Sequence, residues 1–385
     1  MCIKINYQSL IVLDPNQVQN IETGDFKNFS FKSLSEEQFK TFIEKISLCQ
    51  NLQFLSFESC ELGELSPFRL HILLNTIARL PKVRSLDLSW NKFGQFSEEG
   101  WSQVFKDFYP NKTLKILNLS GNNLGRVNQP WFDAFWQGMN QQFQLQSLDL
   151  SWNELNQLSL AATEALWMNL KALPSLTHLD LSDNNLEQLE SNIFDRFFIG
   201  IYQCKALQRL NLKGNSFGKL PIESFQASLQ NVVKIPLVFF NLAYCGLHQF
   251  ESHQEQVVSL FETLSKCSSL RHLYIEGNNF SRESIQVLTD KLSQSQAPLL
   301  VEIRGDLSER LKELIIQNRK ALLAYYKNIG KDFANILPCE MVEEILKKYT
   351  SDEIEKPMRE KVWQGYFQEK TEENPEPLLN KRYDL

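Results

Sequence analysis

One spacing of apolar residues, L-x-x-L-x-L-x-x-N-x-L, occurs eight times along the chain. Leu or another apolar residue stands at positions 1, 4, 6 and 11 of each copy, and Asn or Cys stands at position 9. The first six copies are 31 residues apart, and the eight begin at Leu52, Val83, Leu114, Leu145, Leu176, Leu207, Leu237 and Leu270. A fixed period of this length is typical of a structural unit that buries its apolar face only against its neighbours. The spacing therefore predicts a stack of similar modules.

Each module is predicted to contain a strand followed by a helix. Apolar residues alternate at positions 4 and 6, which indicates a short strand with one buried face. Later in the module the spacing becomes helical, with apolar residues at i, i+1, i+4, i+5 and i+8 from Trp131 and again from Ile193. Strands stack about 4.8 Å apart whereas helices need about 8–10 Å. This mismatch predicts a curved stack with parallel strands inside and helices outside.

The residue at position 9 has a predicted structural role. Where the chain leaves the strand, backbone N–H and C=O groups lose their ladder partners. A buried Asn amide both donates and accepts, so it can satisfy such groups across neighbouring modules. Cys60 and Cys245 take this position in two copies. We interpret both thiols as buried and structural rather than reactive.

These motifs resemble the leucine-rich repeat family over roughly residues 21–306, and the 31-residue period is nearest to its long, ribonuclease-inhibitor-like subclass. The resemblance implies an α/β horseshoe solenoid, with a parallel sheet on the concave side and helices outside. We expect an N-terminal cap at residues 1–51, repeats at residues 52–306 and a small all-helical segment at residues 307–385, with a flexible acidic tail from about residue 368. Within the cap, Ser35 and Gln38 indicate a capping box that begins a helix ending near Leu48.

Composition excludes several classes of protein. The net charge of −6 and the pI near 5.6 argue against a nucleic-acid-binding protein. No apolar run approaches the roughly 18–20 residues of a membrane span, and no secretory signal peptide is visible. The seven cysteines form no CxxC pair, and no catalytic or phosphate-binding motif occurs. We therefore expect a non-enzymatic monomer without metal or cofactor, cytoplasmic in the cell that produces it.

A partner protein is predicted to bind on the concave face and at the strand exits. Side chains at positions 3, 5 and 8 point away from the core. The predicted partner-binding residues are Asp87, Trp90, Asp149, Trp152, His178, Asp180, Asp183, Arg209, Tyr244 and Tyr274. Two alternatives stay open at this stage. Trp90 and Trp152 are either binding anchors or side chains that cover a neighbouring turn near Gly121. The aspartates are either a docking face for a basic partner or a solvated, side-chain-bonded surface.

The C-terminal segment carries two further resemblances. The stretch 337–367 looks like the opening of an F-box, through Leu337, Pro338, Glu340, Ile345, Leu346 and Trp363. This implies, as an alternative function, an adaptor that recruits a host ubiquitin ligase, although Pro followed by Glu also simply begins helices.

The extreme C-terminus is rich in glutamate. Glu369, Glu372, Glu373 and Glu376 precede the apolar residues Leu378, Leu379, Tyr383 and Leu385. This arrangement is similar to the C-terminal signals of type IV-secreted Legionella effectors, and it implies translocation into a host cytosol. The alternative is an acidic tail that serves only solubility.

Overall fold

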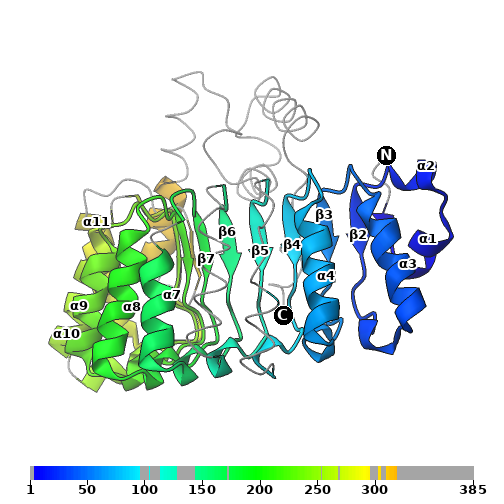
Figure 1. Ribbon diagram of the computed structural model, residues 1–385. Coiled ribbons are helices and arrows are strands. Elements are labelled where there is room, and N and C mark those ends of the chain that lie inside the picture. Colours follow the sequence, from blue (N-terminus) through cyan, green and yellow to red (C-terminus); the bar gives the residue numbers. More distant parts are fainter. Residues whose placement is uncertain are drawn as a thin grey trace, which may run out of the picture. The chain divides into compact units, whose positions relative to one another are not determined.

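The chain divides into two units by its internal contacts, Met1–Ile315 and Ile316–Leu385. The computed structural model describes residues 4–95, 104, 113–127, 144–170, 173–252, 254–267, 269–294, 302–304 and 309–318. Nearly all of these belong to the first unit, and the description below concerns that unit alone (Figure 1).

In the described residues, eleven strands form one parallel sheet whose spatial order is the order of the sequence. Eight of them occupy positions 3–5 of the eight repeats, and adjacent strands pair equivalent positions, as Leu148 with Leu179. The strands are β1 Lys4–Ile5, β2 Thr23–Asp25, β3 Phe54–Ser56, β4 Ser85–Asp87, β5 Ile116–Asn118, β6 Ser147–Asp149, β7 His178–Asp180, β8 Arg209–Asn211, β9 Phe239–Asn241, β10 His272–Tyr274 and β11 Glu302–Arg304. This register confirms the repeat phase read from the sequence.

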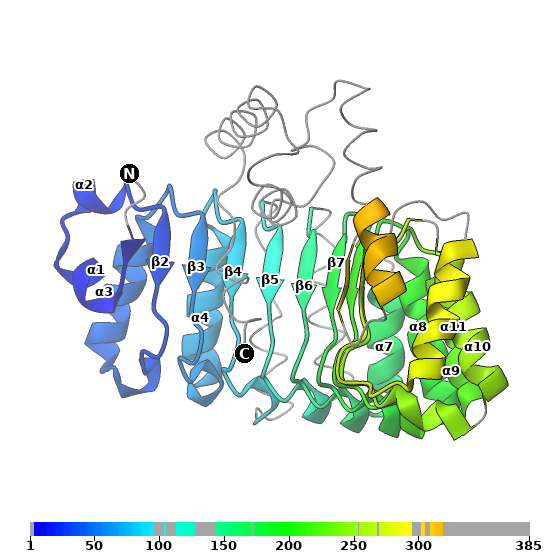
Figure 2. The same ribbon diagram turned by 180° about the vertical axis from the view of Figure 1, so that it is seen from behind.

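Helices cover one face of this sheet. They stand in front of the strands in Figure 1, and the strands stand in front of them in Figure 2. The described helices are α1 Tyr7–Val12, α2 Pro15–Val18, α3 Glu36–Ser47, α4 Pro67–Ala78, α7 Leu160–Leu170, α8 Ser191–Gln203, α9 Ile222–Val232, α10 Gln254–Ser265 and α11 Arg282–Gln294. The helix predicted from Ile193 is α8, which buries Ile193, Phe194 and Phe197. The helix predicted from Trp131 lies outside the described residues.

The repeat leucines form the core between the two layers. In the repeat that begins at Leu145, the side chains of Leu145, Leu148, Leu150 and Leu155 are at most 2% exposed. Position 11 begins a short 3-10 helix, such as Leu155–Gln157, in the first seven of the eight repeats. Because every module buries these leucines against the next, the leucine-rich repeat solenoid predicted from the spacing is confirmed.

The asparagines at position 9 are fully buried and link consecutive repeats. Asn153 Oδ1 accepts from the backbone N–H groups of Asn122 (2.9 Å) and Leu124 (3.2 Å) of the preceding repeat. Its Nδ2 donates to the carbonyl of Leu119 across the repeat boundary (3.0 Å) and to that of Leu150 within its own repeat (3.0 Å). The predicted role of this amide is confirmed.

The two cysteines at position 9 are buried as well. The Cys60 thiol donates to the Phe26 carbonyl (2.9 Å), and the Cys245 thiol donates to the Leu212 carbonyl (3.3 Å). Burial raises the pKa of each thiol to about 12. Neither is ionised near neutral pH, which agrees with a structural role.

The sheet extends beyond the eight repeats at both ends. Strands β1 and β2 lie within residues 1–51 and pair ahead of β3. Helix α3 begins with the predicted capping box between Ser35 and Gln38. At the other end of this unit residues 309–315 are helical, and Leu311 and Ile315 are buried in the core. The rest of the predicted helical segment and its tail lies outside the described residues.

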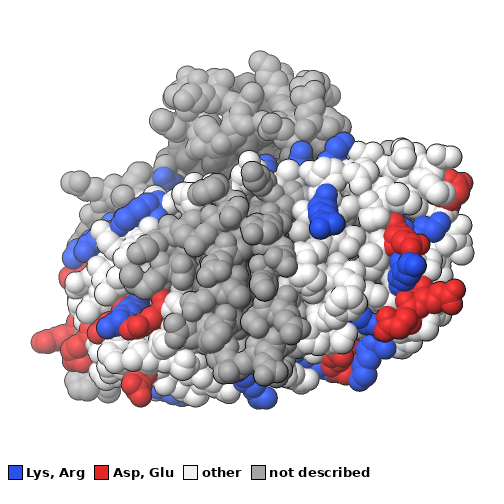
Figure 3. Space-filling model, in the orientation of Figure 1, with Lys and Arg blue, Asp and Glu red and all other residues white. Residues whose placement is uncertain are grey.

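Ion pairs connect consecutive helices on the outer face. Arg69 of α4 pairs with Glu36 of α3 (2.6 Å), and Arg196 of α8 pairs with Glu164 of α7. Figure 3 shows acidic and basic side chains interspersed over the N-terminal end of this face. Such mixed charges give the helical face no field of a single sign there.

Candidate partner-binding groove

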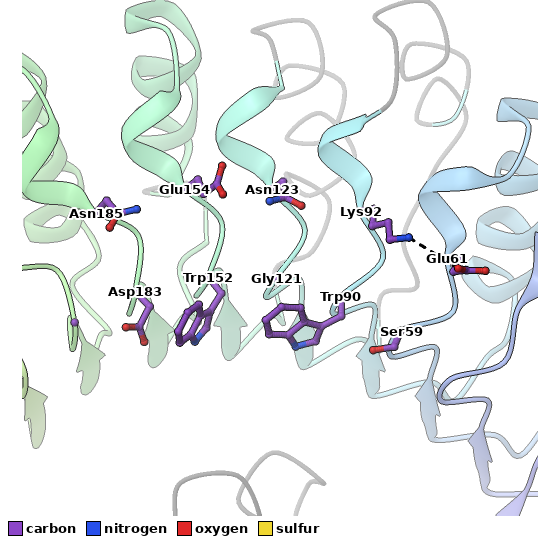
Figure 4. Close-up of a pocket in the computed structure, with 11 residues that line it drawn as sticks. Ser59, Glu61, Trp90, Lys92, Gly121, Asn123, Trp152, Glu154, Asp183 and Asn185 are labelled. Atoms are coloured by element: carbon purple, nitrogen blue, oxygen red, sulfur yellow. Dashed lines mark ion pairs between the residues drawn. The ribbon is translucent and has the colours of Figure 1, made fainter. Parts of the chain in front are cut away.

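The backbone conformation on either side of the buried position 9 sets the geometry of the site. The residues at position 8 all have positive φ, between +54° and +73°, and those at position 10 have φ between +47° and +66°. With position 9 turned into the core, the residues at positions 8 and 10 form two parallel rows beyond the carboxyl ends of the strands (Figure 4).

These two rows enclose an open groove of about 630 Å³, here called the rim groove. One row supplies Trp90, Trp152 and Asp183, and the other supplies Lys92 and Glu154 (Figure 4). The complete lining is Ser59, Glu61, Trp90, Lys92, Gly121, Asn123, Trp152, Glu154, Asp183, Asn185 and Gly214. Five consecutive repeats contribute to it in pairs, and a sixth contributes Gly214.

Two tryptophans dominate the groove. Trp90 is 41% exposed and Trp152 is 55% exposed. Their ring centroids are 6.4 Å apart with 39° between the planes. The repeat between them carries Gly121, and a Cβ placed there would lie 2.5 Å from Cδ2 of Trp90. One side of the Trp90 indole therefore packs on the neighbouring turn, as the packing alternative proposed, while the remaining aromatic surface is open to solvent.

Acidic groups exceed basic ones among the lining residues. The three carboxylates are Glu61, Glu154 and Asp183, against the single ammonium of Lys92. Lys92 is already paired, with Glu64 at 2.6 Å and with Glu61 at 3.9 Å. Burial raises the pKa of Asp183, an effect opposed by the charge of Lys213. The end of the groove near Trp152 thus carries excess negative charge.

The aspartates of the strands are tied into the backbone. Asp149 Oδ1 accepts from the backbone N–H of Ser151 (2.9 Å) and from its hydroxyl (2.7 Å). Asp87 and Asp180 make the same two bonds with the serines two residues later. Burial first, and then the charge of Asp180, raises the pKa of Asp149. These bonds match the side-chain-bonded alternative, although Asp149 is buried rather than solvated, and docking of a basic partner stays a prediction.

Four predicted residues lie elsewhere, on or beside strands β7 to β10. Arg209 stacks over Phe239, with 4.7 Å from Cζ to the ring centroid, and Tyr274 meets the same ring edge-on at 4.9 Å. His178 Nδ1 lies 2.8 Å from the Thr177 hydroxyl, and burial lowers the pKa of His178 to about 4. Tyr244 is exposed and belongs to the row of position 8, beyond the groove.

Of the ten predicted partner-binding residues, Trp90, Trp152 and Asp183 line the rim groove. The row at position 10, which includes Glu61, Asn123, Glu154 and Asn185, was not predicted. The signal in the sequence is a polar residue after position 9 in seven of the eight copies. That signal acquires meaning only when the left-handed backbone turns this residue toward the same side as position 8.

Comparison with known proteins agrees with this architecture. A model described as Leucine Rich repeat matches residues 79–95, 111–126 and 172–187, and a second one, Leucine Rich Repeat, matches residues 206–228. The matched segments, the repeat register and the asparagine ladder define the chain as a leucine-rich repeat protein. No curated protein sequence matches it.

Among solved structures, the chain is similar to the leucine-rich repeat-containing protein LegL7 from Legionella pneumophila. The two share 16% sequence identity and align with a TM-score of 0.57, over 82% of this chain and 97% of that one. At this identity the likeness concerns the fold. None of the described helices combines the length and the apolar character that a membrane span requires.

Proposed function

We propose that this chain is a non-enzymatic, monomeric scaffold that binds a partner protein along the rim groove and the adjoining concave face of the sheet. The observation that carries this proposal is the pair of exposed indoles, Trp90 and Trp152, side by side in the groove. Aromatic side chains at the centre of an interface contribute much of its binding energy. Trp90 is held on Gly121, so it loses little freedom when a partner covers it.

Affinity capture from eukaryotic cytosol tests this function. The full chain and its variants Trp90→Ala and Trp152→Ala serve as bait, with quantitative mass spectrometry of the captured proteins. Loss of an aromatic anchor is expected to weaken capture by about tenfold or more, since anchors contribute roughly 2 kcal/mol. Phe68→Ala is the control, because Phe68 is also an exposed aromatic residue but lies on helix α4 rather than in the groove.

Circular dichroism establishes that each variant keeps its fold. A partner captured equally by the original chain and by both tryptophan variants would contradict the proposal. So would a partner lost equally from the Phe68→Ala control, because that result would indicate a general change of the surface.

We further propose that the protein acts as a type IV-secreted effector in a host cell. Support comes from the glutamate-rich tail at Glu369–Glu376, which lies outside the described residues, and from the similarity of fold to a Legionella pneumophila protein. A translocation reporter fused to the chain should enter host cells from a bacterium with an active type IV system. Replacing Glu369, Glu372, Glu373 and Glu376 with Gln should abolish entry, and undiminished entry would contradict this assignment.

The F-box-like stretch supports the adaptor function as the second candidate. Leu337, Pro338, Glu340, Ile345, Leu346 and Trp363 all lie outside the described residues. An adaptor should co-purify with the linker subunit of a host ubiquitin ligase, and Leu337→Ala with Pro338→Ala should remove that subunit while leaving the groove's partner bound. Absence of the subunit from captures by the original chain would exclude the adaptor function.

A further inference from the structure

We propose that the rim groove selects a basic segment of its partner by receiving an arginine side chain on the exposed indole of Trp152, next to the carboxylate of Asp183. This inference rests on the proposed function and adds the chemistry of the partner to it. Trp152 is more than half exposed, and Asp183 is its neighbour in the row of position 8 (Figure 4).

The chain itself makes this kind of contact elsewhere on the same side of the sheet. Lys213 Nζ lies 5.3 Å from the ring centroid of Tyr244, and the guanidinium of Arg209 lies 4.7 Å from that of Phe239. In both pairs a cation from one repeat covers an aromatic ring of the next repeat. A cation over an aromatic face is attracted by the negative charge density of the ring.

The corresponding cation is missing at the tryptophans. Lys213 is at position 7 of the repeat that precedes Tyr244, and the equivalent residue before Trp152 is Ser120. The equivalent residue before Trp90 is Glu58, which pairs with Lys27 (2.9 Å). Within the described ranges, neither indole has a lysine or arginine over it. The two rings therefore offer the surface that Tyr244 offers, without the intramolecular cation that covers it.

The charges around Trp152 favour a cation from outside. Asp183 and Glu154 line the groove beside it, and Asp180 lies on β7, the strand that leads to Asp183. Of the described cations nearby, Arg126 pairs with Glu154 (3.3 Å), and the charge of Lys213 acts on Asp183. Among the described residues, these three carboxylates outnumber the two cations, so the site complements a positive charge.

Arginine fits this site better than lysine. Its guanidinium is flat, so it can stack on the indole while its N–H groups donate to a carboxylate in the plane of the stack. A lysine ammonium offers only a point charge and is more strongly hydrated. A neutral glycan would also stack on tryptophan and could donate its hydroxyls to the carboxylates, but it carries no positive charge to balance their excess.

The test uses synthetic probes on the full chain. The probes are an arginine–glycine peptide, the same peptide with lysine, the same with glutamate, and a neutral hexasaccharide of glucose. Binding is followed at low salt through the indole N–H resonances, assigned with Trp90→Phe and Trp152→Phe. We expect the arginine peptide to shift both resonances saturably, the lysine peptide to bind more weakly, and the other two probes to leave them unchanged.

Ser120→Lys is the decisive variant, because it would place an intramolecular cation over Trp152 as Lys213 does over Tyr244. Position 7 already accommodates Lys213, so the fold should tolerate this side chain. Ser120→Lys and Asp183→Asn are each expected to lower the affinity for the arginine peptide by about tenfold. This is the size typical of a partly desolvated cation–π contact. Phe68→Ala, the control on helix α4, should bind it normally.

The inference is overturned if the arginine peptide fails to shift the Trp152 resonance, if Ser120→Lys and Asp183→Asn bind it unchanged, or if the hexasaccharide saturates the site. The two proposals can fail separately. Suppose that Trp152→Ala no longer binds a cytosolic partner but Ser120→Lys still does. The groove would then remain the proposed binding site, and arginine would be excluded as the group that it binds.

Discussion

The indole of Trp90 lies on Gly121 of the next repeat, so closely that a Cβ at Gly121 would be 2.5 Å from Cδ2 of Trp90. The same relationship recurs along the row, because a Cβ at Gly277 would lie 2.4 Å from Cδ1 of Tyr244. In both cases a large side chain at position 8 uses the space that a glycine leaves in the following repeat. Glycine in this row therefore determines where an aromatic ring can lie flat.

The substitution Gly121→Ala should displace the Trp90 indole and destabilise the fold. Alanine at φ +67° costs about 1 kcal/mol or more, and the clash with the ring adds roughly 1–3 kcal/mol. Gly246→Ala is the matched control, since Gly246 has φ +66° but its Cβ would meet only the end of Gln249 at 3.3 Å. Urea unfolding measures both variants. Equal losses would show that the ring on Gly121 contributes nothing, and Trp90→Ala should rescue Gly121→Ala in a double-mutant cycle.

The substitution Asn153→Ala should cost about 3 kcal/mol or more of the free energy of unfolding, because it leaves several buried backbone groups without partners. The lost partners include the N–H groups of Asn122 and Leu124 and the carbonyl of Leu119. Asn192→Ala, at an exposed position in the first turn of α8, should change the free energy of unfolding by less than about 0.5 kcal/mol. Chemical denaturation distinguishes the two, and similar values for both would refute a stabilising asparagine ladder.

The substitution Asp149→Asn should stabilise the protein most at alkaline pH. Burial and the charge of Asp180 raise the pKa of Asp149 in the folded state, so the fold favours the protonated carboxyl. This contribution to stability is fully present below the unfolded pKa of about 4 and is lost as the pH rises through the higher folded pKa. The difference in the free energy of unfolding between the variant and the original chain should therefore grow, in favour of the variant, by on the order of 1 kcal/mol from pH 5 to pH 8. Urea unfolding at both pH values measures this gain.

The reverse substitution, Asn to Asp on a neighbouring strand, tests the same effect in the opposite direction. Asn118 occupies the strand between Asp87 and Asp149, and its Oδ1 accepts from the Ser120 N–H (2.9 Å) just as the aspartates do. Asn118→Asp should destabilise the protein, and more so at pH 8 than at pH 5. If the stability of both variants relative to the original chain did not depend on pH, repulsion between the charges of Asp149 and Asp180 would be contradicted.

The described cysteines should not react while the protein is folded. Cys49, Cys60, Cys204, Cys245 and Cys267 are all buried and free. In a Cys2→Ser, Cys339→Ser variant, which removes the thiols outside the described residues, a thiol reagent such as Ellman's should release no product until guanidinium is added. Rapid labelling of the folded variant would show that these thiols are exposed or that repeats open locally.

The sequence predicts the row of position 8 better than the row of position 10. Trp90 and Trp152 attract notice as large aromatics at positions where other copies have glycine. The residues at position 10, such as Glu61, Asn123 and Glu154, are not recognisable in this way, because a polar residue after a buried one is expected on any surface. Likewise Asp149 reads as an exposed charge, yet its neighbours on β5 and β7 and the Ser151 turn bury it. Contacts between repeats, about 31 residues apart in the chain, decide these environments.

The sequence alone determined the repeat, its strand register and the buried role of the asparagines. Each of these depends on spacing within one module, and identical modules must bury the same positions in the same way. The tertiary structure alone decided which side chains share a surface, because neighbours along the solenoid come from different repeats. The rim groove arises from that stacking, in which a glycine in one module lets the tryptophan of the module before it lie flat.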